Sequence, residues 1–226
     1  MGVDSGVMAT GRTDGGTAEV ERAARRGAAE RLIFFSDAVV AIAITLLAID
    51  LPTPTGETSR ELLASLAANS FAYVTFVISF IVIGAHWRAH HRVFRYLRAV
   101  DARFVRLSFT WLLGIVATPF LTEVIREGHM DVVRFGLYAL AQALLQIVLC
   151  ALQWVARRNG LYAPGSAPAT VRPHWWRELA GPVGYLVSIP LYLLLGAWAF
   201  VLWAVVPNVS AAARLTRRVR ARSAGR

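Results

Sequence analysis

The sequence predicts an all-α, polytopic membrane protein with six transmembrane helices. Hydrophobic residues make up 56% of its 226 residues and charged residues only 17%, whereas soluble domains average about a quarter charged. The mean hydropathy is positive, at +0.50. Several apolar stretches reach about 18 residues or more, the length that begins to span a bilayer. So many long apolar stretches exceed what one aqueous core can bury, which argues against a soluble enzyme.

Five apolar runs account for the predicted spans, at 31–51, 67–87, 104–121, 132–156 and 176–207. Each of the first four is about one bilayer long. As a single helix the last run would measure about 48 Å at ~1.5 Å per residue, far more than a ~30 Å hydrocarbon core. Glycines and prolines interrupt it. We therefore expect two short helices that meet near Ser188–Pro190, which brings the number of spans to six.

The distribution of arginine supports this count. All 24 basic residues are arginines, and the formal net charge is +10. Most of them fall in four segments, at 12–31, 88–106, 157–177 and 214–226. Six spans put all four segments on one side of the membrane, whereas five spans would leave the last one on the other side. Because basic loops face the cytoplasm, we expect both termini there, and the charge requires no nucleic-acid partner.

The composition divides the chain into three parts. Residues 1–27 are rich in Gly, Ala, Thr and Arg without an apolar period, which predicts a disordered cytoplasmic tail. Residues 28–208 form the six-helix transmembrane domain. Residues 209–226 form a basic cytoplasmic tail that can touch anionic lipid. The single cysteine, Cys150, excludes a disulfide framework within one chain.

The first apolar run carries an acid close to its inner end. Ser36 and Asp37 lie about 9 Å along the helix axis from Arg31. An ionisable group at that depth is costly unless it faces protein or water, so Asp37 is a functional candidate. A structural role, in which Asp37 pins one helix to another, is equally compatible with its position.

One face of this first helix is apolar. At 100° per residue, six residues lie within roughly 60° of Ile42, and we call them the apolar stripe: Phe35, Ala38, Val39, Ile42, Leu46 and Ile49. Thr45 lies at the edge of the stripe, and Asp37 points about 140° away from its centre. Ordinary helix packing also produces such stripes.

The second apolar run ends in a histidine cluster of His86, His90 and His91. Histidines at i and i+4 can hold a metal, as in one histidine box of a membrane desaturase or hydroxylase. Such enzymes need several boxes, but only His129 and His174 remain, both in loops. We therefore predict no metal and no enzyme. Asp37 and the His90/His91 pair should both lie near the inner interface, where an Asp–His or Asp–Arg contact would satisfy the acid.

Two motifs together resemble the transmembrane protein 175 family of potassium-permeable channels. The first is Arg31-x-x-x-Phe35-Ser36-Asp37 with the Ala-Val-x-Ala-Ile-x-x-Thr-Leu-Leu-x-Ile-Asp-Leu-x-x-Pro segment that ends at Pro54. The second is Trp87-x-x-His90-x-x-x-Phe94 in the second run. The resemblance implies a homotetramer of six-helix units whose first helices line a pore narrowed by apolar side chains. The T-V-G-Y-G filter of ordinary potassium channels does not occur in the sequence.

The resemblance also implies roles for individual residues. Ile42 would form the constriction, with Leu46 and Ile49 farther outward and Thr45 as a nearby polar layer. Asp50 would lie at the outer mouth. The resemblance implies that Arg31, Asp37 and His90 form an inner polar network that supports the pore helix. We expect Ser36, Trp87 and His91, which neighbour these residues, to belong to the same network.

These observations predict a potassium-permeable cation channel, multi-pass in the plasma membrane, whose partners are copies of itself, potassium and other monovalent cations, and the lipid bilayer. No cofactor is expected beside the permeant potassium ion. The alternative is a proton-coupled secondary cation transporter in which Asp37 binds and releases a proton. Transporters usually show paired repeats and broken helices, and here only the Gly- and Pro-interrupted segment 181–190 has that character.

Overall fold

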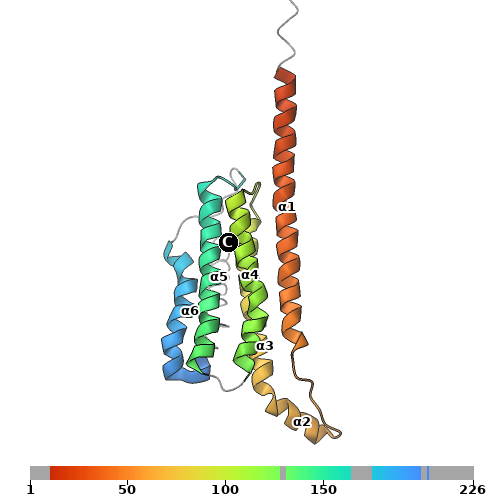
Figure 1. The fold of residues 1–226 in the computed structure, drawn as a ribbon, viewed down its shortest axis with the longest axis vertical. Coiled ribbons are helices and arrows are strands. Elements are labelled where there is room, and N and C mark those ends of the chain that lie inside the picture. The colour runs from red at the N-terminus through yellow and green to blue at the C-terminus, as the bar shows by residue number, and fades with distance from the viewer. Residues whose placement is uncertain (1–10, 128–130, 164–174, 200–202, 204–226) are drawn as a thin grey trace, which may run out of the picture.

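The structure, a computed structural model, describes residues 11–127, 131–163, 175–199 and 203, and its regular elements are all helices (Figure 1). In chain order these are α1 (Gly11–Ile49), α2 (Ser59–Ala68), α3 (Ser70–Phe94), α4 (Ala102–Arg126), α5 (Val132–Arg158), α6 (Trp175–Leu195) and the 3₁₀ turn η1 (Gly196–Trp198). The predicted all-α class is therefore confirmed.

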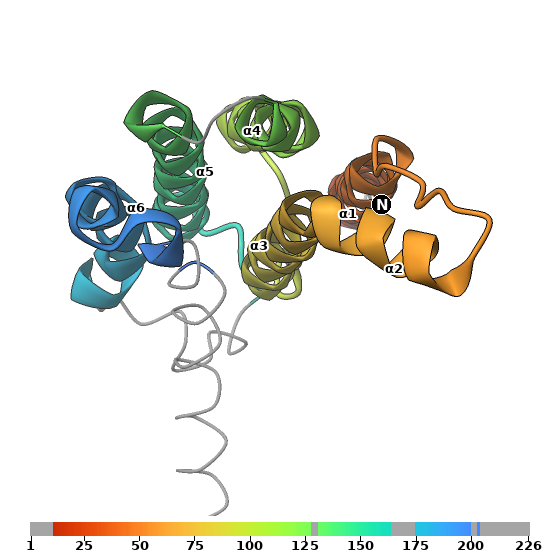
Figure 2. The ribbon, with the colours of Figure 1, turned by 90° about the horizontal axis from the view of Figure 1, so that it is seen from below.

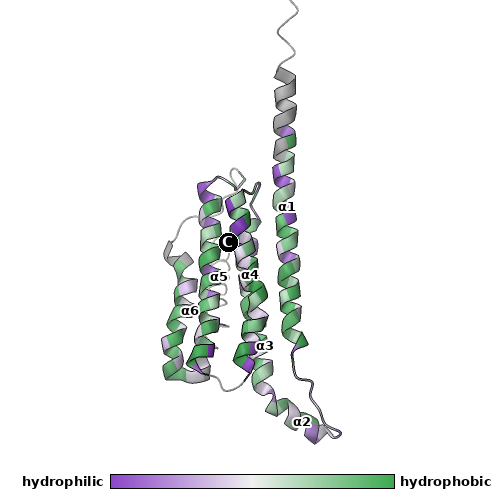
Figure 3. Cartoon of the chain, in the orientation of Figure 1, coloured by the Kyte–Doolittle hydropathy of each residue, from purple (hydrophilic) through white to green (hydrophobic). Residues whose placement is uncertain are grey.

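Four of the described helices are long and apolar enough to cross a membrane. They are the Ala23–Ile49 part of α1, together with α3, α4 and α5. The apolar part of α6, Leu179–Leu195, is shorter. Apolar residues cover the middle of these helices, and polar residues gather at their ends (Figure 3). The chain is a helical membrane protein, as its composition predicts.

The helices α3, α4, α5 and α6 run side by side and form a bundle (Figures 1 and 2). Helix α1 packs against α3 and α4 at one flank, and its N-terminal half projects beyond the end of the bundle (Figure 1). Helix α2 lies across the opposite end and contacts α3. The flank position leaves one side of α1 uncovered by its own chain.

Side chains at the helix starts explain where these helices begin. Asp101 accepts a hydrogen bond from the Phe104 N–H at 2.7 Å, and Asp131 accepts one from the Arg134 N–H at 2.8 Å. Each bond satisfies an N–H group that has no partner within the helix. Helix α2 begins with a capping box, in which the Thr58 side chain accepts from the Glu61 N–H while Glu61 accepts from the Thr58 N–H.

The loops at the basic end of the bundle are joined to each other. Arg98 N–H donates to the Leu161 carbonyl at 2.9 Å, which connects the α3–α4 loop to the segment after α5. The Asn159 side-chain amide donates to Asp101, so the end of α5 is bonded to the start of α4. Partial burial raises the pKa of Asp101, but the hydrogen bonds from Phe104 N–H and Asn159 outweigh it and leave that pKa below its ordinary value.

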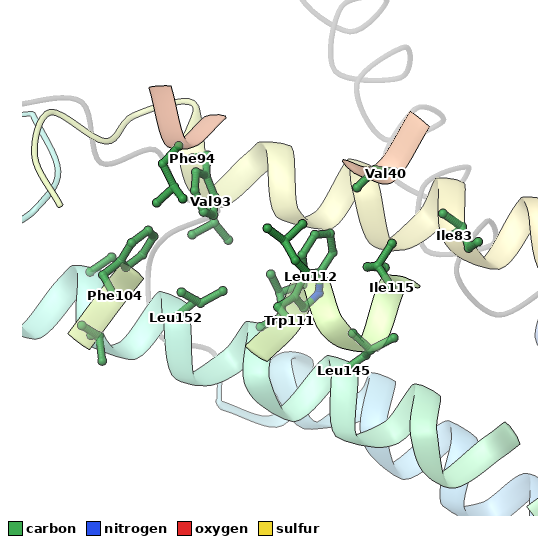
Figure 4. Packing of buried hydrophobic residues seen from close by; sticks show 14 of the residues in the cluster. Val40, Ile83, Val93, Phe94, Phe104, Trp111, Leu112, Ile115, Leu145 and Leu152 are labelled. Carbon is green, nitrogen blue, oxygen red and sulfur yellow. The ribbon is translucent and has the colours of Figure 1, made fainter. Parts of the chain in front are cut away.

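Two apolar cores hold the bundle together. The first joins α1, α3, α4 and α5, and Figure 4 shows Trp111, Ile115 and Leu145 packed between the helices. The second joins α5 and α6 to Trp203, whose ring stacks on Phe135 at 4.6 Å and on Tyr138 at 4.9 Å. Trp203 Nε1 also donates to Ser188 Oγ at 2.9 Å. The chain therefore turns back after α6, so that residue 203 packs against α5.

The start of α1 differs from the disorder predicted for residues 1–27, because the helix begins at Gly11. Residues 18–31 consist mostly of Ala, Glu and Arg, which are strong helix formers. A helix already formed in the membrane segment extends into them without a new nucleation step. Residues 1–10 and the predicted tail at 209–226 lie outside the described residues.

The predicted break near Ser188–Pro190 is wrong, because α6 continues through Pro190 to Leu195. Proline is tolerated within membrane helices, where neighbouring groups and local adjustments satisfy the freed carbonyls. Helix α6 ends instead just before Gly196, whose φ of +56° favours glycine. Residues 200–202 and 204–207 of the expected sixth helix lie outside the described residues. Helix α2, which the apolar runs did not predict, has ten residues and is too short to span a membrane.

We expect Phe135→Ala to destabilise the packing of α6 and Trp203 on α5. The Phe135 ring is fully buried between Tyr192 and Trp203, and its removal leaves a cavity worth about 3 kcal/mol, or roughly 6–12 °C in Tm. Thermal unfolding of the purified protein in detergent measures the change. Val133→Ala, at a position 73% exposed on the same helix, is the control. Equal melting temperatures for the two variants would contradict this packing.

Candidate functional site

Helix α1 has two opposite faces with different environments. The face that packs against the bundle is buried and is lined by Ala29, Leu32, Ser36, Val40, Ala43 and Leu47. On the other side lies the apolar stripe, which is exposed except for the half-buried Val39. The structure thus turns the stripe away from the other helices of its own chain.

The residues predicted to form a constriction and its surroundings all lie on this exposed side. Ile42 is 59% exposed, Leu46 37% and Ile49 72%. Thr45 is exposed between them, and its hydroxyl donates to the Ile42 carbonyl at 2.8 Å. That bond uses the hydroxyl proton and leaves the Thr45 oxygen turned outward with lone pairs to accept from water or to approach a cation. Asp50 follows the stripe at the end of α1 and is exposed.

Asp37 links α1 to α3 through Trp87. The indole Nε1–H of Trp87 donates to Asp37 Oδ1 at 2.9 Å. The predicted Asp–His or Asp–Arg contact is therefore wrong for the described residues, in which Trp87 is the partner. The Asp37 side chain is half-buried rather than fully enclosed, so its carboxylate stays partly accessible. No cationic side chain among the described residues pairs with it.

His90 faces α4 rather than α1. Its ring is buried and stacks on Phe94 at 3.8 Å and on Trp111 at 4.2 Å. His91, by contrast, is exposed and packs against Trp87 at 5.5 Å. The two neighbouring histidines therefore serve different contacts, one between α3 and α4 and the other beside the Asp37–Trp87 pair.

The remaining members of the predicted inner network lie apart from each other. Ser36 is buried, and its hydroxyl donates to the Leu32 carbonyl at 2.7 Å within α1. Arg31 is exposed and forms no hydrogen bond or ion pair with another described residue. Within a single chain the structure brings Asp37, Trp87 and His91 together, but it does not bring Arg31 to Asp37.

The described residues contain no group of three His, Cys, Asp or Glu side chains placed to hold a metal ion. His86 is buried on α3 and stacks near Tyr185 of α6, away from the other two histidines of its cluster. The arrangement around α1 offers an apolar surface, the Thr45 hydroxyl and the half-buried carboxylate of Asp37.

Sequence reasoning missed Trp111, which stacks on His90. The order of the helices did not point to this contact, because His90 lies four residues before the end of α3 whereas Trp111 lies nine residues after the start of α4. At ~1.5 Å per residue, depth measured from the loop that joins the two helices does not pair these residues.

Comparison with known proteins agrees with these features. The profile of the family described as endosomal/lysosomal potassium channel TMEM175 matches residues 31–119, which run from the second half of α1 through α2 and α3 into α4. A potassium channel of Streptomyces collinus is 34% identical over 166 residues, which cover 71% of this chain and 81% of that protein. A potassium channel of Chryseobacterium sp. is 29% identical over 122 residues, or 53% of this chain and 62% of that protein.

A solved structure supports the same relationship. The crystal structure of a lysosomal potassium-selective channel TMEM175 homolog from Chamaesiphon minutus superposes with a TM-score of 0.68 at 26% sequence identity. The match covers 82% of this chain and 97% of that chain. Together, the sequence and fold similarities show that this chain is a bacterial-type member of the TMEM175 potassium channel family.

Proposed function

We propose that the chain assembles as a homotetrameric, potassium-permeable cation channel of the plasma membrane, with α1 of each subunit lining the pore. The observation that carries this proposal is the exposed apolar stripe of α1, directly opposite the face that packs on α3 and α4. One helix stripe cannot enclose a pore, and a closed cyclic assembly of identical subunits can. The potassium-channel relatives support the permeant ion.

We further propose six spans with both termini in the cytoplasm. The arginines at the end of α3, the start of α4 and the end of α5 all lie at one end of the bundle, where α1 also enters (Figure 1). The positive-inside rule makes that end cytoplasmic. The return of the chain at Gly196 and the packing of Trp203 on Phe135 support a sixth span that leads back to the same side.

In this assembly four Ile42 side chains form the constriction. An apolar ring offers no ligand, so an ion keeps most of its hydration shell or passes only when the ring widens. Potassium is less tightly hydrated than sodium and loses less on passage, which gives a real but modest preference. The Thr45 oxygens replace part of the lost hydration, with Leu46 and Ile49 farther outward. Four copies of Asp50 raise the local cation concentration at the outer mouth.

The inner contacts fix the orientation of the pore helix. Asp37 and Trp87 hold α1 against α3, while His90 holds α3 against α4 through Trp111. We assign Arg31, Ser36 and His91 to the same network, with Arg31 directed toward a neighbouring subunit because no described group of its own chain binds it.

Ion flux in proteoliposomes tests the function. The purified protein, reconstituted with a potassium gradient, should carry a current whose reversal potential follows the potassium gradient, at rates beyond those of an alternating-access cycle. A proton-coupled secondary cation transporter would instead show slow flux that moves with the proton gradient. Slow, proton-dependent flux would overturn the channel proposal in favour of that alternative.

We expect Asp37→Asn to weaken assembly rather than ion selection, because Asp37 points away from the stripe and bonds to Trp87. The amide accepts a weaker, uncharged hydrogen bond, so the tetramer yield should fall severalfold. Size-exclusion chromatography with mass measurement gives the yield, and bilayer recording gives the permeability ratio. Trp87→Phe, which removes the donor alone, should have the same effect. A normal tetramer with altered potassium-to-sodium permeability would place Asp37 in the pore.

We expect Ile42→Asn to open a wetter and less selective path, with an increase in open probability or conductance and a lower potassium-to-sodium permeability ratio. Single-channel recording measures both quantities. Thr45→Ala is the companion variant and should lower the potassium preference without increasing leak. Val133→Ala, at an exposed position of α5 away from α1, should leave both unchanged. If Ile42→Asn leaves conductance and permeability ratio unchanged, the constriction does not lie at this residue.

A further inference from the structure

Two arginines from different helices converge on one tryptophan at the basic end of the bundle. The guanidinium carbon of Arg103, on α4, lies 5.4 Å from the centre of the Trp154 ring on α5. The guanidinium carbon of Arg158, one turn after Trp154, lies 5.0 Å from the same centre. The two cations are therefore at most about 10 Å apart, within about one Debye length at 0.1 M salt.

A hydrogen bond between the helix ends fixes this arrangement. The Asn159 amide, adjacent to Arg158, donates to Asp101 Oδ2, and the Phe104 N–H donates to Asp101 Oδ1. Arg103 lies between Asp101 and Phe104 in the sequence, and Arg158 directly precedes Asn159. The Asn159–Asp101 hydrogen bond therefore fixes the distance between the two arginines. Both carboxylate oxygens of Asp101 accept these bonds. Arg103 is close enough to Asp101 for its charge to help lower the pKa of that carboxyl, but neither arginine forms a direct ion pair with another described residue.

The cluster lies where the proposed topology places the cytoplasmic membrane surface. Trp154 is 43% exposed and both arginines are exposed, at the ends of two membrane-length helices. A half-exposed tryptophan at this level is typical of the membrane–water interface. Two turns deeper on α5, on the same face as Trp154, Ile147 is 47% exposed and offers an apolar surface next to the acyl chains.

We propose that Arg103, Trp154 and Arg158 form a binding site for the phosphate of an anionic phospholipid in the cytoplasmic leaflet. Paired guanidinium groups are suited to phosphate oxygens, and basic sites between membrane helices on the cytoplasmic side bind anionic headgroups. The indole keeps both guanidinium groups in place before the lipid arrives. The apolar surface at Ile147 selects a lipid over a free phosphate. The site depends on the orientation of α4 and α5 in the membrane and not on conduction by α1.

Native mass spectrometry of the full-length protein tests the site. The detergent-solubilised protein is titrated with phosphatidylglycerol, with phosphatidylcholine and with sn-glycerol 3-phosphate. The unmodified protein should bind phosphatidylglycerol more tightly than either of the others. Each surface arginine contributes about fivefold in affinity, so Arg103→Gln with Arg158→Gln should weaken phosphatidylglycerol binding by about 25-fold. Arg60→Gln, at the opposite end of the molecule, removes a charge and should leave that binding unchanged.

A variant that keeps both arginines tests the geometry. Asn159→Ala removes the bond to Asp101 without a change of charge and should weaken phosphatidylglycerol binding at least twofold. Thermal unfolding in detergent confirms that each variant remains folded. The proposal is overturned if folded Arg103→Gln/Arg158→Gln protein binds phosphatidylglycerol as tightly as the unmodified protein. It is also overturned if phosphatidylcholine or glycerol 3-phosphate binds equally well. Channel recordings of the same variants test conduction independently, so that a failure of the lipid site can be told apart from a failure of the proposed channel function.

Discussion

The structure depends on the way α1 is held by one face alone. The small residues Ala29, Ser36 and Ala43 lie on that face and let α1 approach α3 and α4 closely, as expected for helix contacts in lipid. The bulky residues Ile42 and Ile49 lie on the other side. In lipid an apolar surface requires no burial, so apolarity alone would not assign the stripe to a pore. Its position opposite the bundle, on a helix at the flank, is the observation on which the proposed pore assignment rests.

The inner contacts matter because they set the rotation of α1. A rotation by one residue, about 100°, would carry Ile42 from the open side toward α3 or α4. The Asp37–Trp87 bond prevents that rotation close to the basic end, while Val40 and Leu47 pack against the bundle along the membrane segment. The aromatic stack of His90 with Trp111 fixes the α3–α4 pair that receives α1. A network remote from the stripe thereby determines which side chains the stripe presents.

Much of this architecture was predictable from the sequence because lipid imposes long apolar runs. The runs at 104–121 and 132–156 fall within α4 and α5. The residues that share the exposed side of α1 follow from angle alone, whereas their exposure is a finding of the structure. The break in the last run was misplaced because proline signals a helix end in water, whereas Pro190 is tolerated in a membrane helix. Helix α6 ends instead just before Gly196, which has a positive φ.

The contacts between helices were less predictable than the helices. The depth of Asp37 indicated that it needs a partner, but His90, His91 and Trp87 lie within two turns of each other, and one residue changes the direction of a side chain by 100°. The rotation of α3 selects Trp87, and apolar periodicity does not determine it because the polar residues between His86 and Arg92 are spread around the helix. Helix α2 escaped prediction because its ten residues are too short for a span. Its capping box, Thr58 with Glu61, was the available signal.

Disulfide cross-linking along α1 tests the central claim most directly. In a Cys150→Ser background, single cysteines are placed at Ile42, on the stripe, and at Val40, on the buried face, and membranes holding the protein are oxidised. The account predicts intersubunit disulfides with Ile42→Cys and none with Val40→Cys, because the stripes of neighbouring subunits face each other across the pore. Cross-linking through Val40→Cys, with none through Ile42→Cys, would contradict it and show that the assembly brings the opposite face of α1 together.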